Sequence, residues 1–331
     1  MISPSLPAAL KAALDAKLEG AARSAIAARA EKISKTYRDG GGSGTITTET
    51  DALAYAAARM PATYAAVSAS LNALDEIRPE FAPTTVLDVG AGPGTASFAA
   101  AEAFASLSSF VMLDANDALR ALALDLAKDS QRFAEMVYRR GEAKTLLATS
   151  EPADLVIASY VVGELGEADR RELANQLWAR THDTLVVVEP GTPAGYARII
   201  ALRTQLIEAG AHVAAPCPHD GACPLTKPDW CHFTQRLPRS RAHKQVKGVD
   251  VPFEDEKFSF CVLSKSSVAS RPARVLAQPS VGKVEVVAKL CTANGLATVR
   301  IAHRDRHAYA QARRWRWGDA VMGESSRDSS R

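Results

Sequence analysis

The stretch TTVLDVGAGPG at residues 84–94 decides the fold. Its first half is a short aliphatic and β-branched run, typical of a buried strand, and its second half places glycines at positions 90, 92 and 94. Glycine permits a tight turn and lets a ligand approach the backbone closely, and the helix that follows adds the positive end of its dipole. The stretch therefore predicts a strand, a glycine-rich turn and a helix that together bind a nucleotide-like cofactor.

Strands and helices alternate after this turn. Three more aliphatic runs predict strands, at 109–114, 154–159 and 184–190. Segments with helical spacing lie between or after them, at 95–107, 116–129, 167–180 and 193–210. This alternation predicts an α/β fold with a doubly wound parallel sheet.

The regions on either side have a different pattern. Alanine-rich residues with helical spacing predict an N-terminal helical region at 5–35 and 49–76, where Pro61 is expected to break or kink the second helix. Residues 213–256 are rich in Pro, Cys, His and charge and show no clear period. Four further runs predict strands that close the sheet and form a small β appendage, at 258–265, 273–278, 283–290 and 297–302.

Two aspartates narrow the choice of cofactor. Asp88 precedes the first glycine, where it could lie near the cationic methionine end of S-adenosylmethionine (SAM), and Asp114 ends the second strand, where a carboxylate can accept both ribose hydroxyls. A nicotinamide dinucleotide would share the glycines and Asp114, but its pyrophosphate would fit poorly beside the Asp88 carboxylate. The pattern favours SAM, with expected contacts from Asp88, Gly90, Gly92, Gly94 and Asp114.

The segment after the third strand identifies no acceptor. It lacks the Asn/Asp-Pro-Pro-Tyr/Phe run of amino-group methyltransferases, and it lacks a Pro-Cys pair for attack on a pyrimidine because all five cysteines come later. Tyr160 and Glu164 could face a transferred methyl group, although Glu164 equally fits a structural role. The sequence therefore assigns no catalytic residue.

Three of the five cysteines lie within 15 residues of a loop-like segment, at Cys217, Cys223 and Cys231. Clustered cysteines in an intracellular chain bind metal more often than they form disulfides, and a metal would supply folding energy to this segment. The candidates for a fourth ligand are His219, His232, Cys261 and Cys291. Cys261 lies in an apolar run and is expected to be a buried small hydrophobe. Spacing alone favours zinc, then an iron–sulfur cluster, with free thiols as the alternative.

Charge is distributed unevenly. The net formal charge is +3, but residues 231–331 hold 19 Lys and Arg against 9 Asp and Glu, whereas residues 1–230 hold 21 against 28. The C-terminal excess favours a polyanionic partner, with a basic solvated surface as the alternative. No apolar run is long enough to span a bilayer, and the N-terminus lacks the pattern of a secretory signal, so we expect an intracellular protein.

Seven segments together resemble one family: DVGAGPG, ASYVVGEL, VEPGTPAG, CPHDGACPL, DWCHFTQRL, FEDEKFSF and RHAYAQARRWRWGD. From about residue 50 to 320, the chain resembles the small-ribosomal-subunit-associated methyltransferase-like family of bacteria and mitochondria. The resemblance implies a class I SAM-methyltransferase Rossmann-like fold, binding to small-subunit ribosomal RNA (rRNA) and a role in subunit assembly. It also implies a four-iron, four-sulfur (4Fe-4S) cluster, with zinc as second choice, at the positions matching the family's cysteines: Cys217, Cys223, Cys231 and Cys291.

An RNA partner would explain the basic C-terminal residues. Five follow the third cysteine and three lie near the end: Arg236, Arg239, Arg241, Lys244, Lys247, Arg313, Arg314 and Arg316. Such side chains neutralise phosphates. The interleaved Trp315 and Trp317 could stack on unpaired bases or pack in the core of the appendage.

We expect three parts, namely a helical N-terminal extension (1–80), a SAM-methyltransferase-like domain (81–265) with a metal-binding cysteine loop (213–240), and a basic C-terminal β appendage (266–331). The first hypothesis is a SAM-dependent methyltransferase acting on rRNA. The second is a SAM-binding, cluster-stabilised assembly factor that docks without methylating, and a small-molecule methyltransferase is a weaker third. No DNA or membrane partner is expected, and the location is the cytoplasm of a bacterium or the mitochondrial matrix of a eukaryote.

Overall fold

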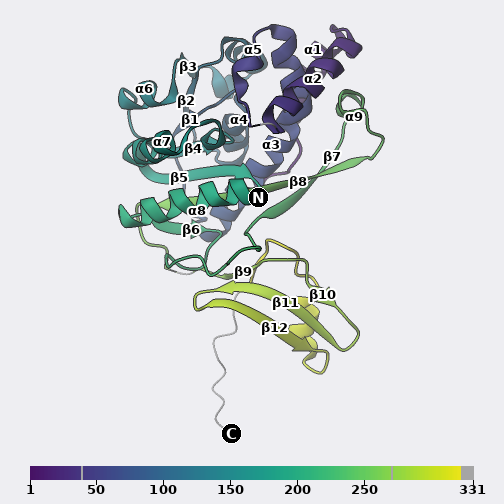
Figure 1. The fold of residues 1–331 in the computed structure, drawn as a ribbon, viewed down its shortest axis with the longest axis vertical. Coiled ribbons are helices and arrows are strands. Elements are labelled where there is room, and N and C mark those ends of the chain that lie inside the picture. Colours follow the sequence, from purple (N-terminus) through teal and green to yellow (C-terminus); the bar gives the residue numbers. More distant parts are fainter. Residues whose placement is uncertain (39, 270, 322–331) are drawn as a thin grey trace.

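The computed structural model describes residues 1–38, 40–269 and 271–321. A large sheet with helices on both faces forms most of the molecule, and a smaller C-terminal sheet lies beside it, below the main body in Figure 1. The strands of the large sheet are β1 (Thr85–Val89), β2 (Ser109–Asp114), β3 (Val137–Arg140), β4 (Ala153–Ser159), β5 (Thr181–Pro190), β6 (His212–Ala215), β7 (Phe233–Pro238) and β8 (Phe253–Ser264).

The strand order of the large sheet is that of a class I methyltransferase. Strands β3, β2, β1, β4 and β5 lie side by side in that order and run parallel. The second half of β8 lies between β5 and β6 and runs antiparallel to both, while its first half pairs with β7. The predicted doubly wound α/β fold is therefore confirmed, including the antiparallel strand that closes the sheet.

Side chains along each strand alternate between two hydrophobic cores, one on each face of the sheet. Val86 and Leu155 point into the first core, whereas their neighbours Leu87 and Val156 point into the second. The first core is covered by α1 (Ala8–Glu19), α2 (Arg23–Arg38), α3 (Glu49–Ile77), α4 (Thr95–Ala103) and α5 (Asp117–Ala127). The second is covered by α6 (Ala143–Ala148), α7 (Glu167–Ala179) and α8 (Pro193–Glu208).

Helix α3 is the long support of the first face. A capping box starts it, in which the Asp51 amide donates to the Thr48 hydroxyl at 3.1 Å and the Thr48 amide donates to Asp51 at 3.0 Å. The helix continues through Pro61, so the predicted break does not occur. An internal proline costs about 3 kcal/mol, and the full burial of Met60 and Ala62 against the sheet offsets this cost.

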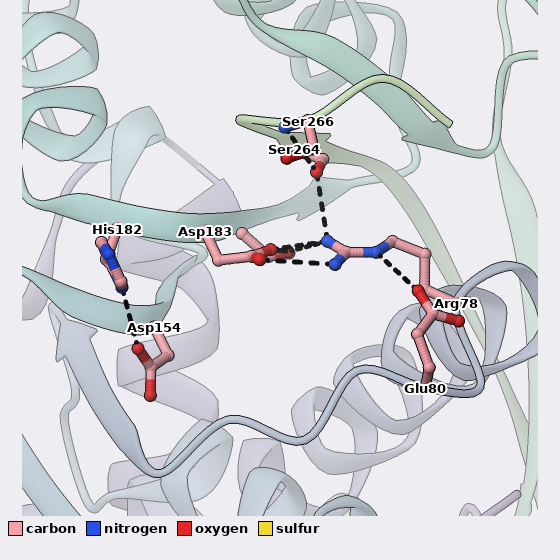
Figure 2. Close-up of polar contacts among 8 residues, drawn as sticks. Arg78, Glu80, Asp154, His182, Asp183, Ser264 and Ser266 are labelled. Carbon is pink, nitrogen blue, oxygen red and sulfur yellow. Dashed lines mark hydrogen bonds and ion pairs between the residues drawn. The ribbon is translucent and has the colours of Figure 1, made fainter. Parts of the chain in front are cut away.

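An arginine network joins the end of α3 to the sheet (Figure 2). The Arg78 guanidinium donates to both Asp183 oxygens, at 2.5 and 3.3 Å, and to the hydroxyls of Thr184 and Ser264 at 3.1 Å. Burial alone would raise the pKa of Asp183, but the bonds from Arg78 and Thr184 hold it below its ordinary value. Arg78 thereby fastens α3 to the start of β5 and the end of β8.

Within the described residues, the C-terminal unit is a five-stranded sheet with one helix. It contains β9 (Ala273–Val275), β10 (Ser280–Val281), β11 (Glu285–Thr292), β12 (Gly295–Ala302), β13 (Ala320–Val321) and α10 (Arg306–Ala312). Strands β11 and β12 form an antiparallel hairpin that turns at Gly295, where φ is +109°. Small clusters around Val275 and Tyr309 form its core. Among the described residues, no helix is long and apolar enough to cross a membrane.

Candidate functional site

The glycine turn stands where β1, β2 and β4 end. Its three glycines have left-handed backbone angles, with φ of +70° at Gly90, +54° at Gly92 and +80° at Gly94. At Gly90 space is also lacking, because a β-carbon would lie 2.5 Å from Cγ2 of Val161. The Gly90 amide donates to the Leu113 carbonyl at 2.8 Å, which fixes the turn against β2. This is the edge at which sheets of this kind bind nucleotides.

Asp88 lies directly beneath the turn and is fully buried. Its Oδ2 accepts bonds from the amide (3.0 Å) and the hydroxyl (2.8 Å) of Ser97 in the first turns of α4. Its Oδ1 has no partner in the part of the chain that is described. Burial, opposed in part by Ser97, raises the pKa of Asp88 to about 7. Ionisation of this carboxyl group would therefore be favoured by a nearby cation.

Asp114 ends β2 and is half-buried beside the turn. Its Oδ2 accepts a bond from the Gly92 amide at 2.9 Å, and its Oδ1 accepts one from the Asn116 amide at 2.7 Å. Burial raises the pKa of Asp114. Each carboxylate oxygen can accept a further bond, so the group is held in place with capacity left for two hydroxyls. From β3, the Tyr138 hydroxyl donates to the Gly92 carbonyl at 2.7 Å and supports the turn from behind.

Residues 41–46, here called the strap, cross this edge between α2 and α3. The Ser43 amide and hydroxyl donate to Oε2 of Glu164 at 3.3 and 3.1 Å, and the Tyr37 hydroxyl donates to Oε1 at 3.2 Å. On the other side, the Asn116 side chain donates to the carbonyls of Ser43 and Ile46 at 3.0 and 2.8 Å. Glu164 thus has the structural role that the sequence left open, and the strap is tied on both sides of the edge of the sheet that carries the glycine turn.

Tyr160 follows β4 and has an unusual backbone. Its φ of +59° is the only left-handed one among the described non-glycine residues, and such strain concentrates at functional sites. Its hydroxyl donates to Glu256 at 2.9 Å. Beside it, Glu189 at the end of β5 is fully buried and accepts a bond from Arg198 at 2.6 Å. Burial raises the pKa of Glu189, although Arg198 opposes this. Sequence reasoning missed Glu189.

The four predicted cysteine ligands line one cavity, where β6, β8 and the C-terminal unit meet. Cys217, Cys223 and Cys231 come from the connection between β6 and β7, and Cys291 comes from β11. Cys261 is buried in β8 as expected and also borders the cavity. Burial raises the pKa of Cys231, and the neighbouring thiols raise it further. The structure therefore gathers all five cysteines, of which the first and the last lie 74 positions apart along the chain.

Two buried arginines and a tyrosine lie beside the thiols. Arg203 of α8 and Arg274 of β9 are 2% and 4% exposed. Arg203 donates to the carbonyls of His219 and Gly221 at 2.7 and 2.9 Å, and its Nε has no partner in the described structure. The Tyr196 hydroxyl donates to Cys223 Sγ at 3.2 Å. Two buried cations beside thiols suit a site that carries negative charge.

The two histidines that were candidate ligands differ in position. His219 Nε2 lies 3.9 Å from Cys291 Sγ, at the edge of the thiols. His232 stacks on Trp230, with ring centres 4.9 Å apart, and meets Trp317 edge-on at 4.6 Å. His232 is therefore part of an aromatic cluster.

The arrangement of the cysteine thiols can be compared with what a metal site requires. Within the described ranges, no group of three or more His, Cys, Asp or Glu side chains is arranged to hold a metal ion. A tetrahedral zinc site needs all its sulfurs about 2.3 Å from one point. An iron–sulfur cluster places its own iron and sulfide atoms between the thiolates, so its cysteines stand further apart. The cavity is lined by thiols and two buried arginines and by no carboxylate, which is a donor set of the soft, thiolate type.

The family model of the mitochondrial small ribosomal subunit protein Rsm22 matches residues 49–322. The match includes the glycine turn, the strained Tyr160 and all five cysteines that line the cavity. The chain belongs to the Rsm22 family. The resemblance drawn from the sequence motifs is thereby confirmed.

Two curated relatives of this Rsm22-family chain are mitochondrial proteins. The human mitochondrial ribosome assembly protein METTL17 is 30% identical over 296 residues, which cover 83% of this chain and 63% of the human protein. The mitochondrial Rsm22-cox11 tandem protein 2 of Schizosaccharomyces pombe is 25% identical over 326 residues, covering 82% of this chain and 43% of that protein. The match thus spans less than two thirds of the human relative and less than half of the yeast one.

Solved methyltransferase structures are similar to this Rsm22-family chain at low identity. Precorrin-6y C5,15-methyltransferase of Geobacter metallireducens is 14% identical, with a TM-score of 0.41, covering 59% of this chain and 88% of that one. The SAM-bound magnesium protoporphyrin IX methyltransferase of Synechocystis is 12% identical, with a TM-score of 0.40, covering 70% and 90%.

The basic residues of this Rsm22-family chain fall into two groups. Arg236 forms a two-bond pair with Asp255, and Arg239 and Lys247 both bond Glu254, so the cations after the third cysteine are largely neutralised. In contrast, five arginines of the C-terminal unit are exposed: Arg304, Arg306, Arg313, Arg314 and Arg316. Of these eight cations, the five that are exposed and bond no carboxylate within the described residues all lie in the C-terminal unit.

The two tryptophans of this segment pack inward. Trp315 contacts the clusters around Val275 and Tyr309, and Trp317 packs against the core of the large sheet. The packing alternative therefore holds for both. Trp317 also joins the C-terminal unit to the main body.

Proposed function

We propose that this protein is a SAM-binding, metal-centre-stabilised assembly factor of the small ribosomal subunit that docks on its rRNA. The observation that carries the proposal is the position of the thiol cavity between the methyltransferase-like sheet and the C-terminal unit with its exposed arginines. One molecule thus combines a cofactor edge, a metal-type donor set and a basic surface. Membership of a ribosomal family supports the choice of partner.

The cofactor edge supports SAM. Gly90, Gly92 and Gly94 leave backbone room for the ligand, Asp114 is placed for the ribose hydroxyls, and Asp88 lies below with an unpartnered oxygen for the cationic methionine end. SAM, when bound, supplies an electrophilic methyl group. The residues of the chain hold and orient it, and the strap covers the edge.

The metal centre is proposed to be a 4Fe-4S cluster held by Cys217, Cys223, Cys231 and Cys291, with zinc as second choice. Its role is structural. Because Cys291 belongs to β11 and the other three belong to the large-sheet domain, the centre would lock the C-terminal unit to the sheet.

Docking on RNA is supported by charge. The exposed arginines around α10 neutralise phosphates and release counterions, which gives salt-dependent binding. Both relatives are named as mitochondrial proteins, which supports the mitochondrial matrix as the location of this protein. The bacterial cytoplasm is the alternative.

Methylation of rRNA is the second candidate function. The intact glycine turn and Asp114 favour it, whereas the missing acceptor motif after β4 favours docking alone. The basic C-terminal unit weakens a third possibility, a small-molecule methyltransferase.

One set of measurements tests these proposals. The protein is purified without air, its visible spectrum, iron and zinc are measured, and transfer of tritiated methyl from SAM to small-subunit RNA is assayed. A colourless zinc protein would overturn the cluster. RNA labelling that disappears in Asp114→Ala would overturn docking without methylation. Failure to bind SAM would overturn the assignment of the cofactor edge, and failure to bind RNA would overturn docking on rRNA.

A further inference from the structure

A large cavity opens beside the cofactor edge. Its volume is about 1260 Å³, and it lies between α2, α3, the end of α9 (Arg241–Lys247) and the carboxyl ends of β4 and β5. It meets the strap through Tyr37, Gly41 and Glu164, which also line it. Pockets for small ligands usually measure about 300–1000 Å³, so this space can hold a group the size of a nucleotide in addition to a cofactor at the edge.

Arg59 of α3 is a cation in this cavity with spare donors. It is half-buried, and no hydrogen bond or ion pair holds its guanidinium within the described residues. The two carboxylates that raise its pKa, Glu256 and Glu254, are bonded to other groups. Glu256 accepts a hydrogen bond from the Tyr160 hydroxyl, and Glu254 accepts hydrogen bonds from Arg239 and Lys247. A planar guanidinium with free N–H groups matches a phosphate, which it can bind with two bonds.

Arg59 lines this cavity together with Tyr55 of α3 and Tyr160 at the end of β4, whereas the glycine turn, Asp88 and Asp114 are not among the lining residues. Two other cations line the cavity, but Lys247 bonds Glu254 at 2.5 Å and Arg198 bonds Glu189 at 2.6 Å. Arg59 therefore lies beside the cofactor edge, and its charge is the one in this cavity that bonds no carboxylate within the described residues.

Tyrosine rings supply the flat surfaces of the cavity. Tyr37 and Tyr55 have ring centres 6.0 Å apart, and Tyr160 lines the same space from the end of β4. Rings of this kind stack on bases that have left a helix, and phosphate contacts position the backbone beside them.

We propose that this cavity binds one unpaired nucleotide of RNA, with its phosphate on Arg59 and its base against the tyrosine rings. The proposal rests on the RNA partner proposed above and adds the place where that RNA meets the cofactor edge. A base within a duplex cannot enter, so the nucleotide must come from a single strand or be turned out of a helix.

The test is photocrosslinking of a single-stranded RNA octamer that contains one 4-thiouridine, with the crosslinked peptide mapped. We expect crosslinks at Tyr55 or Tyr160. Arg59→Leu should lower the yield about tenfold, in line with the loss of a charged hydrogen bond, and Arg59→Lys should recover part of it. Arg171→Leu removes the same charge from the exposed surface of α7 and should leave the yield unchanged. The unfolding midpoint of each variant controls for folding.

The other outcomes separate the alternatives. Loss of SAM affinity in Arg59→Leu, with RNA crosslinking intact, would assign Arg59 to the cofactor and overturn the proposal. Crosslinks confined to the C-terminal unit would overturn the nucleotide pocket while leaving RNA docking in place. Binding of a glutamate octapeptide that depends on Arg59, without an RNA crosslink in the cavity, would assign the cavity to a protein partner. Absence of any RNA binding would overturn both this proposal and docking.

Discussion

The buried carboxyl group of Asp88 ties the stability of the protein to pH. Burial raises its pKa from 3.8 to about 7. The folded protein therefore binds this proton more tightly than the unfolded chain, and stability falls as pH rises through the interval between the two values. At 1.36 kcal/mol per pH unit the full penalty is about 4 kcal/mol. Between pH 5 and pH 8 the expected loss is about 2.5 kcal/mol.

Asp88→Asn removes this titration while keeping an oxygen that can accept the Ser97 bonds. Unfolding in urea, without SAM and at constant ionic strength, should show the variant gaining about 2.5 kcal/mol relative to the natural protein from pH 5 to pH 8. Asp51→Asn is the matched control. Asp51 has a pKa of about 2 because its bonds from Thr48 and Arg29 outweigh burial, so its stabilisation is lost only below about pH 4. The difference in unfolding free energy between Asp51→Asn and the natural protein should therefore be equal at pH 5 and pH 8.

A difference between the natural protein and Asp88→Asn that stays constant from pH 5 to pH 8 would refute the reasoning. It would mean that solvent reaches the carboxyl group in the folded state. A second measurement uses the ligand. If Asp88 faces a cation, SAM should bind the natural protein more tightly at pH 8 than at pH 6, and this pH dependence should be absent from Asp88→Asn.

Three other substitutions have defined outcomes. Gly90→Ala should abolish SAM binding measured by calorimetry, because its β-carbon meets Val161. Gly92→Ala has no atom nearer than 3.8 Å and should lower the free energy of unfolding in urea by only about 1–2 kcal/mol, through backbone strain. Equal losses of unfolding free energy in the two variants would contradict this difference. Arg78→Leu should lower the free energy of unfolding by about 2 kcal/mol, since it leaves Asp183 without its partner, and an unchanged urea midpoint would show that the network is dispensable. Arg203→Leu should lower metal content after chelator treatment severalfold, measured as iron, sulfide and zinc, and full retention would show that its charge does not support the centre.

The gathering of the residues at the proposed cofactor edge could be predicted from the sequence because its parts are local. The three glycines and Asp88 lie within residues 88–94, and Asp114 ends the next strand of a parallel sheet, which places it beside the turn. The strap could not be predicted in this way. Its bond to Glu164 joins residues 121 positions apart, and a run of glycines gives no sign of such an anchor.

The thiol cavity was predictable only in part. Three cysteines are close in sequence, but spacing left the fourth ligand open among His219, His232, Cys261 and Cys291. The family resemblance singled out Cys291, and the structure places it with the other three. Arg203 gave a faint signal, as a lone charge within the apolar helix segment IIALRTQLI, whereas Arg274 gave none.

Charge counting predicted a basic C-terminal region but not which cations are open. Arg236 and Arg239 precede the acidic segment of β8 by about 15 to 20 residues, and the β7–β8 hairpin brings them together. A sequence count treats both members of such a pair as separate charges. Only strand register shows that they neutralise each other.

The continuous helix α3 sets a limit on how this protein can be divided. Its buried residues, from Ala52 to Leu74, belong to the same core as the strand residues Val86 and Leu155. A fragment that starts at residue 81 would keep every residue of the glycine turn and the cover supplied by α4 and α5, and yet expose to water the part of this core that α1, α2 and α3 cover. Such a fragment should aggregate, and so the smallest piece that can be produced for cofactor studies begins before α3.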